Sequence, residues 1–75
     1  MIYILTPRYS DFQRICYKLK LDIRTRELVF IDSPIKLYGR TIKDTDTVIK
    51  GSEYYLFEPE IMERIEYEIE LRKRL

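Results

Sequence analysis

The chain has 75 residues, of which 45% are hydrophobic and 36% are charged, and its formal net charge at pH 7 is +1. A chain of this length forms one small domain, here residues 1–75, and its apolar content excludes a disordered tail. Because it has one cysteine and no histidine, it can form neither an internal disulfide nor a Cys/His metal cage. We therefore predict no metal site and no cofactor.

The charges are divided unevenly along the chain. Residues 1–40 hold eight Lys/Arg and four Asp/Glu, a net of +4, whereas residues 41–75 hold six and nine, a net of −3. This split could steer a partner or a second copy of the chain. The alternative is a solvated helix face at the acidic end. No apolar run reaches the roughly 20 residues that span a bilayer, and the N-terminus lacks a signal-peptide pattern, so we expect a cytoplasmic protein without a membrane contact.

The first half of the chain predicts a strand, a helix and a second strand. "MIYIL" is a short apolar run of the kind that is buried on both faces of a parallel sheet. In "SDFQRICYKLKL", Ser10 and Gln13 have the spacing of a capping box. One face of this helix carries the apolar residues Phe12, Ile15, Cys16 and Leu19, and Cys16 reads as a small buried hydrophobe. "ELVFID" is the second strand.

A short turn and a third strand follow. In "SPIKLYG", Ser33 is a favourable N-cap, Pro34 suits the first helical position, and Gly39 lies just past the end. "DTVIKG" then reads as a third strand that begins after Asp44 and Asp46. These aspartates lack the other ligands of a calcium loop.

The last helix is predicted to begin at Pro59 and to run to the chain end. Its spacing allows ion pairs with the acid four residues ahead of the base, namely Glu60–Arg64, Glu68–Arg72 and Glu70–Arg74. One arc faces the sheet and contains Ile61, Met62, Ile65 and Ile69. A second arc lies nearly opposite and contains Tyr67, Leu71 and Leu75. A helix on a sheet needs one apolar stripe, so we expect the second arc to mediate self-association, as in a homodimer.

These elements predict a minimal, three-stranded, mainly parallel α/β sheet with the first strand in the middle, a Rossmann-like layout. An α+β fold with an added antiparallel strand at Glu53–Phe57 is the alternative. The first strand–helix junction, "TPRYSDFQ", has no glycine-rich phosphate loop, which argues against nucleotide binding. Thr6, Arg8, Ser10 and Asp32 could still form a small polar site at the carboxyl edge of the sheet, although such residues more often cap helices and turns.

The seven tyrosines bear on the kind of partner. Basic and aromatic residues alternate in the first half, as in proteins that stack on single-stranded nucleic acid. Amphipathic tyrosines are also favoured at protein–protein interfaces, which we prefer. Beyond the helix arc, the predicted contacts for a partner or an anion are Arg8, Tyr9 and Arg40.

Three stretches carry a resemblance: "IYILTPRYSDFQ", "LVFIDSPIKLYGR" and "DTVIKGSEYYL". Together they resemble small, uncharacterised phage-encoded α/β proteins, and they are similar to the strand skeleton of P-loop NTPases without the phosphate loop. The resemblance implies a non-enzymatic accessory protein in the cytoplasm of an infected bacterium, which binds a host or phage protein. No catalytic residue is predicted, since the chain offers no convincing acid–base pair. A nucleic-acid-binding module and a small-ligand binder at the sheet edge are the alternatives.

Overall fold

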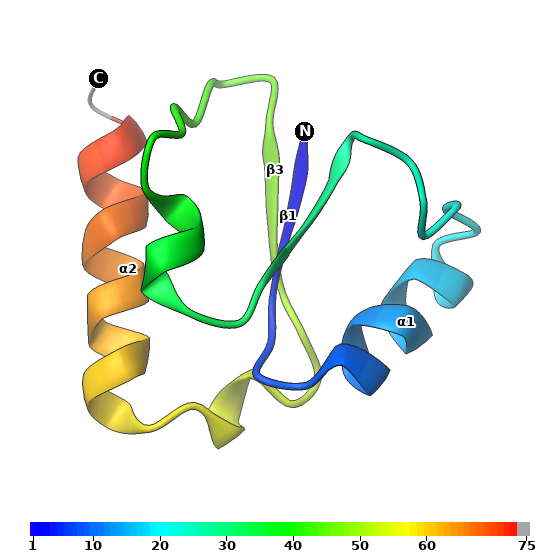
Figure 1. The fold of residues 1–75 in the computed structure, drawn as a ribbon, viewed down its shortest axis with the longest axis horizontal. Coiled ribbons are helices and arrows are strands. Elements are labelled where there is room, and N and C mark those ends of the chain that lie inside the picture. The colour runs from blue at the N-terminus through cyan, green and yellow to red at the C-terminus, as the bar shows by residue number, and fades with distance from the viewer. Residues whose placement is uncertain (74–75) are drawn as a thin grey trace.

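Three parallel strands form the middle layer of the fold in the computed structural model, which describes residues 1–73 (Figure 1). Their order across the sheet is β2-β1-β3, and their bounds are Ile2–Leu5 for β1, Leu28–Ile31 for β2 and Thr47–Lys50 for β3. Both outer strands run parallel to β1. The predicted three-stranded parallel α/β fold, with the first strand in the middle, is therefore confirmed.

Helices lie on both faces of this sheet. One face carries α1 (Tyr9–Lys18), and the other carries α2 (Pro59–Lys73) with a short 3-10 helix, η1 (Pro34–Leu37) (Figure 1). The side chains of β1 alternate between two apolar clusters, because successive residues of a strand point to opposite faces. Tyr3 and Leu5 pack in the cluster on the α2 side, and Ile4 packs in the cluster on the α1 side.

The segment after β3 is not a strand. Residues Tyr54–Leu56 form a second 3-10 helix, η2, which leads into α2. The alternative fold with an antiparallel strand at Glu53–Phe57 is therefore wrong. The aromatic residues of this segment are part of the core instead. Tyr54 and Phe57 pack edge-to-face, and both belong to the cluster on the α2 side.

The start of α1 differs from the prediction. The N-cap position is Arg8, which is extended and makes no side-chain capping bond, and Ser10 lies inside the first turn. The predicted capping box at Ser10 is therefore wrong, because Pro7 and Arg8 already turn the chain into the helix. Of the predicted apolar face, Phe12 and Cys16 are buried, but Leu19 lies at the C-cap and is exposed.

The predicted turn after β2 is confirmed. The Ser33 hydroxyl accepts a hydrogen bond from the backbone N–H of Ile35, and Pro34 is the first residue of η1. Gly39 follows with a φ of +79°, a conformation that glycine adopts without steric cost.

The predicted start and inner face of α2 are also confirmed, whereas the predicted end of the helix lies outside the described residues. The helix begins at Pro59, Ile65 and Ile69 are buried, and Ile61 and Met62 pack at the margin of the core. A second side of the helix is also covered, because η1 packs against α2 and buries Glu68 and Arg72. The prediction of a single covered stripe was therefore incomplete.

Candidate functional site

The carboxyl ends of β1 and β3 form the place where ligands bind in open parallel sheets. From these two adjacent strands the chain leaves toward opposite faces, to α1 and to α2 (Figure 1). In open α/β sheets such a divergence creates a crevice outside the strand ends, called the topological switch point. The residues that line it decide whether the fold has a ligand site here.

A carboxylate of the chain itself occupies this switch point. Asp11, in the first turn of α1, is fully buried. The Thr6 hydroxyl donates to its Oδ2 at 2.8 Å, and the backbone N–H of Glu53 donates to the same oxygen at 3.1 Å. The Ser52 hydroxyl donates to Oδ1. Asp11 thus ties together the segments that follow β1 and β3, where a bound anion would otherwise lie.

Gly51 lets the backbone after β3 approach the Asp11 carboxylate closely, because it has no side chain. A Cβ atom at this position would lie 2.5 Å from Asp11 Oδ2 and 2.9 Å from the Cβ of Thr6. Both contacts are shorter than a normal van der Waals distance. The residue that directly follows β3 therefore has to lack a side chain for the carboxylate to fit.

Asp11 is held in its charged form. Burial raises the pKa of its carboxyl, but hydrogen bonds from Ser52, from the Glu53 backbone and from Thr6 outweigh burial and hold the pKa below the ordinary value of 3.8. A carboxylate that is ionised near neutral pH has no proton to give, and the hydrogen bonds that it accepts come from the chain itself. The group is suited to structure and not to acid–base catalysis.

The arginines at this edge lie near a second internal carboxylate. Arg8 and Arg14 each approach the Glu53 carboxylate to 3.9 Å. One oxygen of Glu53, Oε2, is buried and accepts no hydrogen bond from the described residues. The positive charge at this edge is thus partly balanced by the chain itself.

The other residues predicted for a small-ligand site lie apart from this cluster. The Asp32 carboxylate pairs with the Lys36 ammonium at 2.9 Å, across the first turn of η1. Ser10 makes no side-chain hydrogen bond within residues 1–73. Thr6 therefore belongs to the Asp11 cluster, and within residues 1–73 Asp32 forms no ion pair or hydrogen bond with Arg8 or Ser10.

The predicted partner contacts Arg8, Tyr9 and Arg40 lie on opposite sides of the sheet. The Tyr9 ring packs on Phe12 and Phe30, with ring centroids 5.6 Å and 5.4 Å away, on the α1 side. The Arg40 guanidinium donates from Nε to the Lys36 carbonyl at 3.1 Å, at the end of η1. These residues do not form one surface.

Two predicted residues do lie on an exposed surface of α2. Tyr67 is 57% exposed and Leu71 is 44% exposed. Leu75 lies outside the described residues. The structure adds Tyr38, which follows η1 and is 53% exposed.

Arginines lie against both tyrosines of this surface. The guanidinium carbon of Arg64 lies 5.3 Å from the centre of the Tyr67 ring, and that of Arg72 lies 5.6 Å from the centre of the Tyr38 ring. The Tyr38 hydroxyl, and after it the Glu68 carboxylate, raise the pKa of Arg64. We call Tyr38, Arg64, Tyr67 and Leu71 the aromatic–arginine surface.

A buried ion pair holds the backbone beneath this surface. Arg72 donates from Nε to the carbonyl of Leu37 in η1 and from Nη1 to the Glu68 carboxylate. Arg64 adds a third member, with its guanidinium 2.9 Å from Glu68. The predicted Glu68–Arg72 pair is confirmed, and it fixes η1 against α2.

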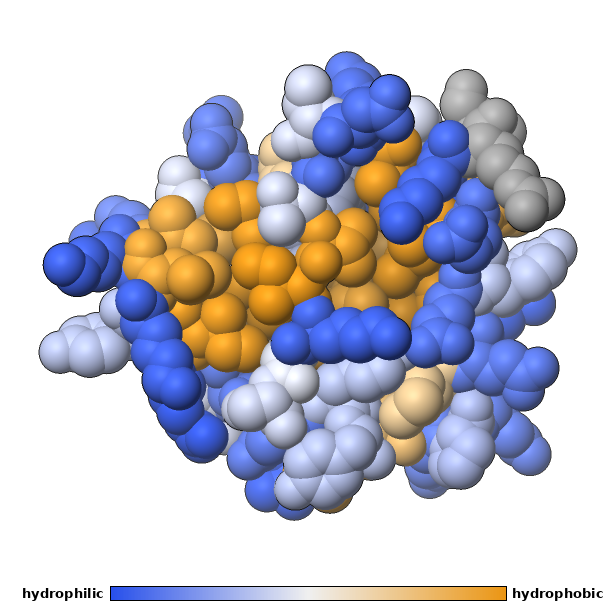
Figure 2. Space-filling model, turned by 180° about the vertical axis from the view of Figure 1, so that it is seen from behind, coloured by the Kyte–Doolittle hydropathy of each residue, from blue (hydrophilic) through white to orange (hydrophobic). Residues whose placement is uncertain are grey.

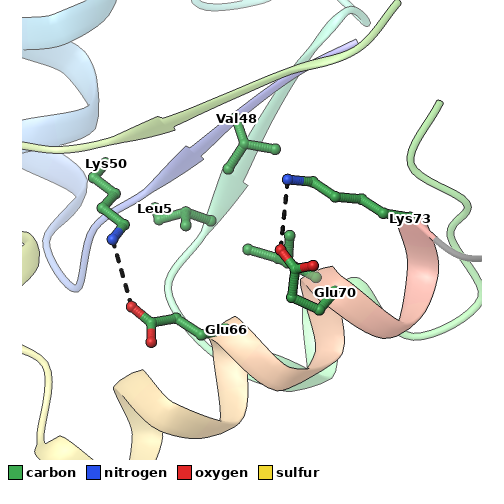
Figure 3. A pocket seen from close by; sticks show the side chains of 7 residues that line it. Leu5, Val48, Lys50, Glu66, Glu70 and Lys73 are labelled. Carbon is green, nitrogen blue, oxygen red and sulfur yellow. Dashed lines mark hydrogen bonds and ion pairs between the residues drawn. The ribbon is translucent and has the colours of Figure 1, made fainter. Parts of the chain in front are cut away.

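A groove runs between β3 and α2, with a volume of about 460 Å³. Its floor is apolar and consists of Leu5, Val48 and Ile69. Two ion pairs border it (Figure 3), Lys50–Glu66 at 3.4 Å and Lys73–Glu70 at 3.7 Å. Figure 2 looks from the side on which β3 lies and shows a broad apolar area crossed and bordered by charged side chains.

Comparisons with known proteins give no relative for this chain. No protein-family model, no curated protein and no solved structure matches it. Within residues 1–73, no cluster of His, Cys, Asp and Glu side chains has the arrangement of a metal site. The helices in the same part of the chain are too short or too polar to cross a membrane.

Sequence reasoning missed the residues that organise the switch point, namely Asp11, Gly51, Ser52 and Glu53. One signal was available, because a glycine directly after a strand marks close approach of backbone to another group. No local pattern indicates the place of Tyr38, since its position against Arg72 depends on the packing of η1 on α2.

Proposed function

We propose that the protein is a non-enzymatic interaction module that binds another protein through the aromatic–arginine surface. The observation that supports this most strongly is that each tyrosine ring lies against an arginine, Tyr67 against Arg64 and Tyr38 against Arg72, while both rings remain more than half exposed. Tyrosine and arginine are the residue types that dominate the binding energy of protein interfaces.

The two elements that carry this surface are joined to each other within the chain. Tyr38 directly follows η1, Tyr67 lies on α2, and the buried Arg72 joins these two elements through Leu37 and Glu68. Side chains that are already held in place lose little conformational entropy on binding. A shallow hollow lined by Glu60, Glu63, Arg64 and Tyr67 adjoins the Tyr67 ring, and its charged lining suits a polar side chain of the partner.

The closed switch point supports a non-enzymatic function. The position at which α/β folds bind ligands is filled by Asp11 and its donors Thr6 and Ser52. A small-ligand site at this edge, the alternative from the sequence, would require the chain to displace its own buried carboxylate.

A capture experiment from bacterial lysate tests the proposal. The tagged chain is compared with Tyr67→Glu, which places a carboxylate on the surface. The matched control is Tyr17→Glu, since Tyr17 is 85% exposed on α1, on the other face of the sheet. We expect one protein to be retained by the wild type and by Tyr17→Glu, and to be lost with Tyr67→Glu. Equal retention by all three chains would refute the proposed surface.

Treatment with nuclease separates this proposal from nucleic-acid binding. Proteins that are held through DNA or RNA are released by nuclease, and their retention falls steeply with salt. A partner bound by the aromatic–arginine surface is retained in both conditions. The identity of that partner as a host or phage protein, and the phage origin itself, stay predictions from the resemblance.

A further inference from the structure

The outer edge of β3 has backbone groups that no strand of the sheet uses. The N–H groups of Thr47 and Gly51 donate to the carbonyls of Met1 and Leu5, in and next to β1. In a strand, the N–H and C=O of alternate residues point to the same side. The N–H and C=O groups of Val48 and Lys50 therefore point away from β1, toward the open edge.

The side chains of β3 are also incompletely covered, on both faces. Val48 lies in the groove on the α2 side, and Ile49 packs at the margin of the cluster on the α1 side. Both are half-buried, whereas Tyr3, Ile4 and Leu5 of the central strand are buried. The helices cover β1 more fully than β3, so β3 resembles an inner strand that lacks its outer neighbour.

We propose that this neighbour is β3 of a second copy of the chain, paired antiparallel about a two-fold axis centred on Ile49. In this register Val48 lies opposite Lys50 of the second copy, and Lys50 lies opposite Val48. Every N–H and C=O that points outward from Val48 and Lys50 then finds a partner. The two sheets become one continuous sheet.

The same register pairs apolar side chains. Ile49 lies directly opposite Ile49 of the second copy, as a pair without hydrogen bonds between the two residues, with Cα atoms about 4.5 Å apart. On the other face, the aliphatic stem of Lys50 covers Val48 of the second copy. Cross-strand pairs of this kind stabilise antiparallel sheets.

Charge complementarity favours a second copy as the occupant. Along the groove, Lys50 and Glu66 form one ion pair, and Glu70 and Lys73 form the next, one turn further along α2 (Figure 3). The two-fold axis reverses this order, so that the Lys50–Glu66 pair of one copy faces the Glu70–Lys73 pair of the other. A lysine and a glutamate of one copy then face a glutamate and a lysine of the other, so neither side of the interface carries a single sign of charge.

The interface is small and does not overlap the aromatic–arginine surface. A contact through one short strand lies in the size class of weak interfaces, so we expect a dimer that dissociates on dilution. Sedimentation velocity over a concentration series measures this directly. A monomer at every concentration would overturn the proposal.

Cysteine crosslinking tests the register. Ile49→Cys places two thiols at a Cα separation of about 4.5 Å, within the disulfide range. Val48→Cys places its two thiols diagonally, about 7 to 8 Å apart, which is too far. We expect rapid disulfide dimers of Ile49→Cys under mild oxidation. We expect none of Val48→Cys or of the wild type, whose Cys16 is buried. Equal or faster crosslinking of Val48→Cys would overturn the register.

Charge reversal at the axis gives a second test. Ile49→Lys and Ile49→Glu each place like charges opposite one another and should sediment as monomers, whereas their equimolar mixture should form a dimer. Circular dichroism verifies that each variant is folded. Tyr67→Glu should keep the dimer. Loss of the dimer with Tyr67→Glu would assign self-association to α2, as the sequence predicts, and would overturn the β3 pairing.

Discussion

The carboxyl edge and the lateral edge of the same sheet differ in how their polar groups are satisfied. At the carboxyl edge, between β1 and β3, the buried Asp11 receives hydrogen bonds from Thr6, Ser52 and the Glu53 backbone. At the lateral edge, the backbone groups of Val48 and Lys50 point away from the sheet. Buried polar groups without partners cost free energy, and groups at an exposed edge remain free to pair with another chain.

This contrast between the two edges separates the part of the fold that stabilises the monomer from the part that is available for binding. The closed edge lies at the position that α/β proteins commonly use for ligands, yet here it contributes to stability. The open edge and the aromatic–arginine surface keep exposed groups that could bind a partner. Substitutions at the closed edge should therefore change stability, and substitutions at the open edge should change association.

The largest effect is expected at Gly51. Gly51→Ala introduces a Cβ atom 2.5 Å from Asp11 Oδ2 and 2.9 Å from the Thr6 Cβ, so either the carboxylate or the strand end has to move. Overpacking of this kind costs about 3 kcal/mol of unfolding free energy. Urea denaturation followed by circular dichroism measures the loss.

Gly39→Ala is the matched control, because it tests the other glycine of the chain. An added Cβ at Gly39 meets no atom within 4 Å, and only the φ of +79° opposes it. A residue with a side chain in this left-handed conformation costs about 1 kcal/mol. An equal loss at both glycines would contradict the close approach of Asp11 to Gly51.

Asp11→Asn is expected to have the next largest effect. The amide keeps the size of the side chain but removes an acceptor, which leaves one of its buried donors unsatisfied, at a cost of about 2 kcal/mol at pH 7. The same change at the exposed Asp44, whose side chain makes no hydrogen bond or ion pair within residues 1–73, is the control.

The difference in unfolding free energy between the wild type and Asp11→Asn should depend on pH, and the lowered pKa of Asp11 sets its direction. Since the pKa of Asp11 is lowered from 3.8 in the folded protein, the carboxylate stabilises the fold fully above pH 3.8. That contribution is lost as the pH falls through the lower, folded-state pKa. The gap between the wild type and Asp11→Asn should be constant near neutral pH and should narrow in acid. A gap that widens in acid would show that burial, and not hydrogen bonding, controls this group.

Most of the fold could be predicted because the strands are short apolar runs and the turn residues are distinctive. Pro34, Gly39 and Pro59 have the positions that their backbone preferences indicate. The extent of pairing after β3 was harder to predict. "EYYLF" has the composition of a strand, but Tyr54 and Phe57 pack into the core from a 3-10 turn.

The candidate sites could be predicted only in part, for a physical reason. The Asp11–Ser52 hydrogen bond joins residues separated by 41 positions, and no local pattern indicates such a contact. Helical spacing did predict the Glu68–Arg72 pair and the exposed Tyr67 and Leu71. It could not show that η1 buries the ion pair and places Tyr38 beside Arg72.

The smallest effect on stability is expected at the open edge. Lys50→Ala removes an exposed ion pair with Glu66, whose charged atoms are 3.4 Å apart, and such pairs contribute about 0 to 1 kcal/mol. The thermal midpoint of a dilute, monomeric sample should therefore barely change, in contrast to that of Gly51→Ala. At high concentration the same variant should sediment as a weaker dimer, because the lysine stem that covers Val48 of the second copy is missing. A large loss of stability in the dilute sample would mean that Lys50 belongs to the core of the monomer, and the contrast between the closed and the open edge would then be wrong.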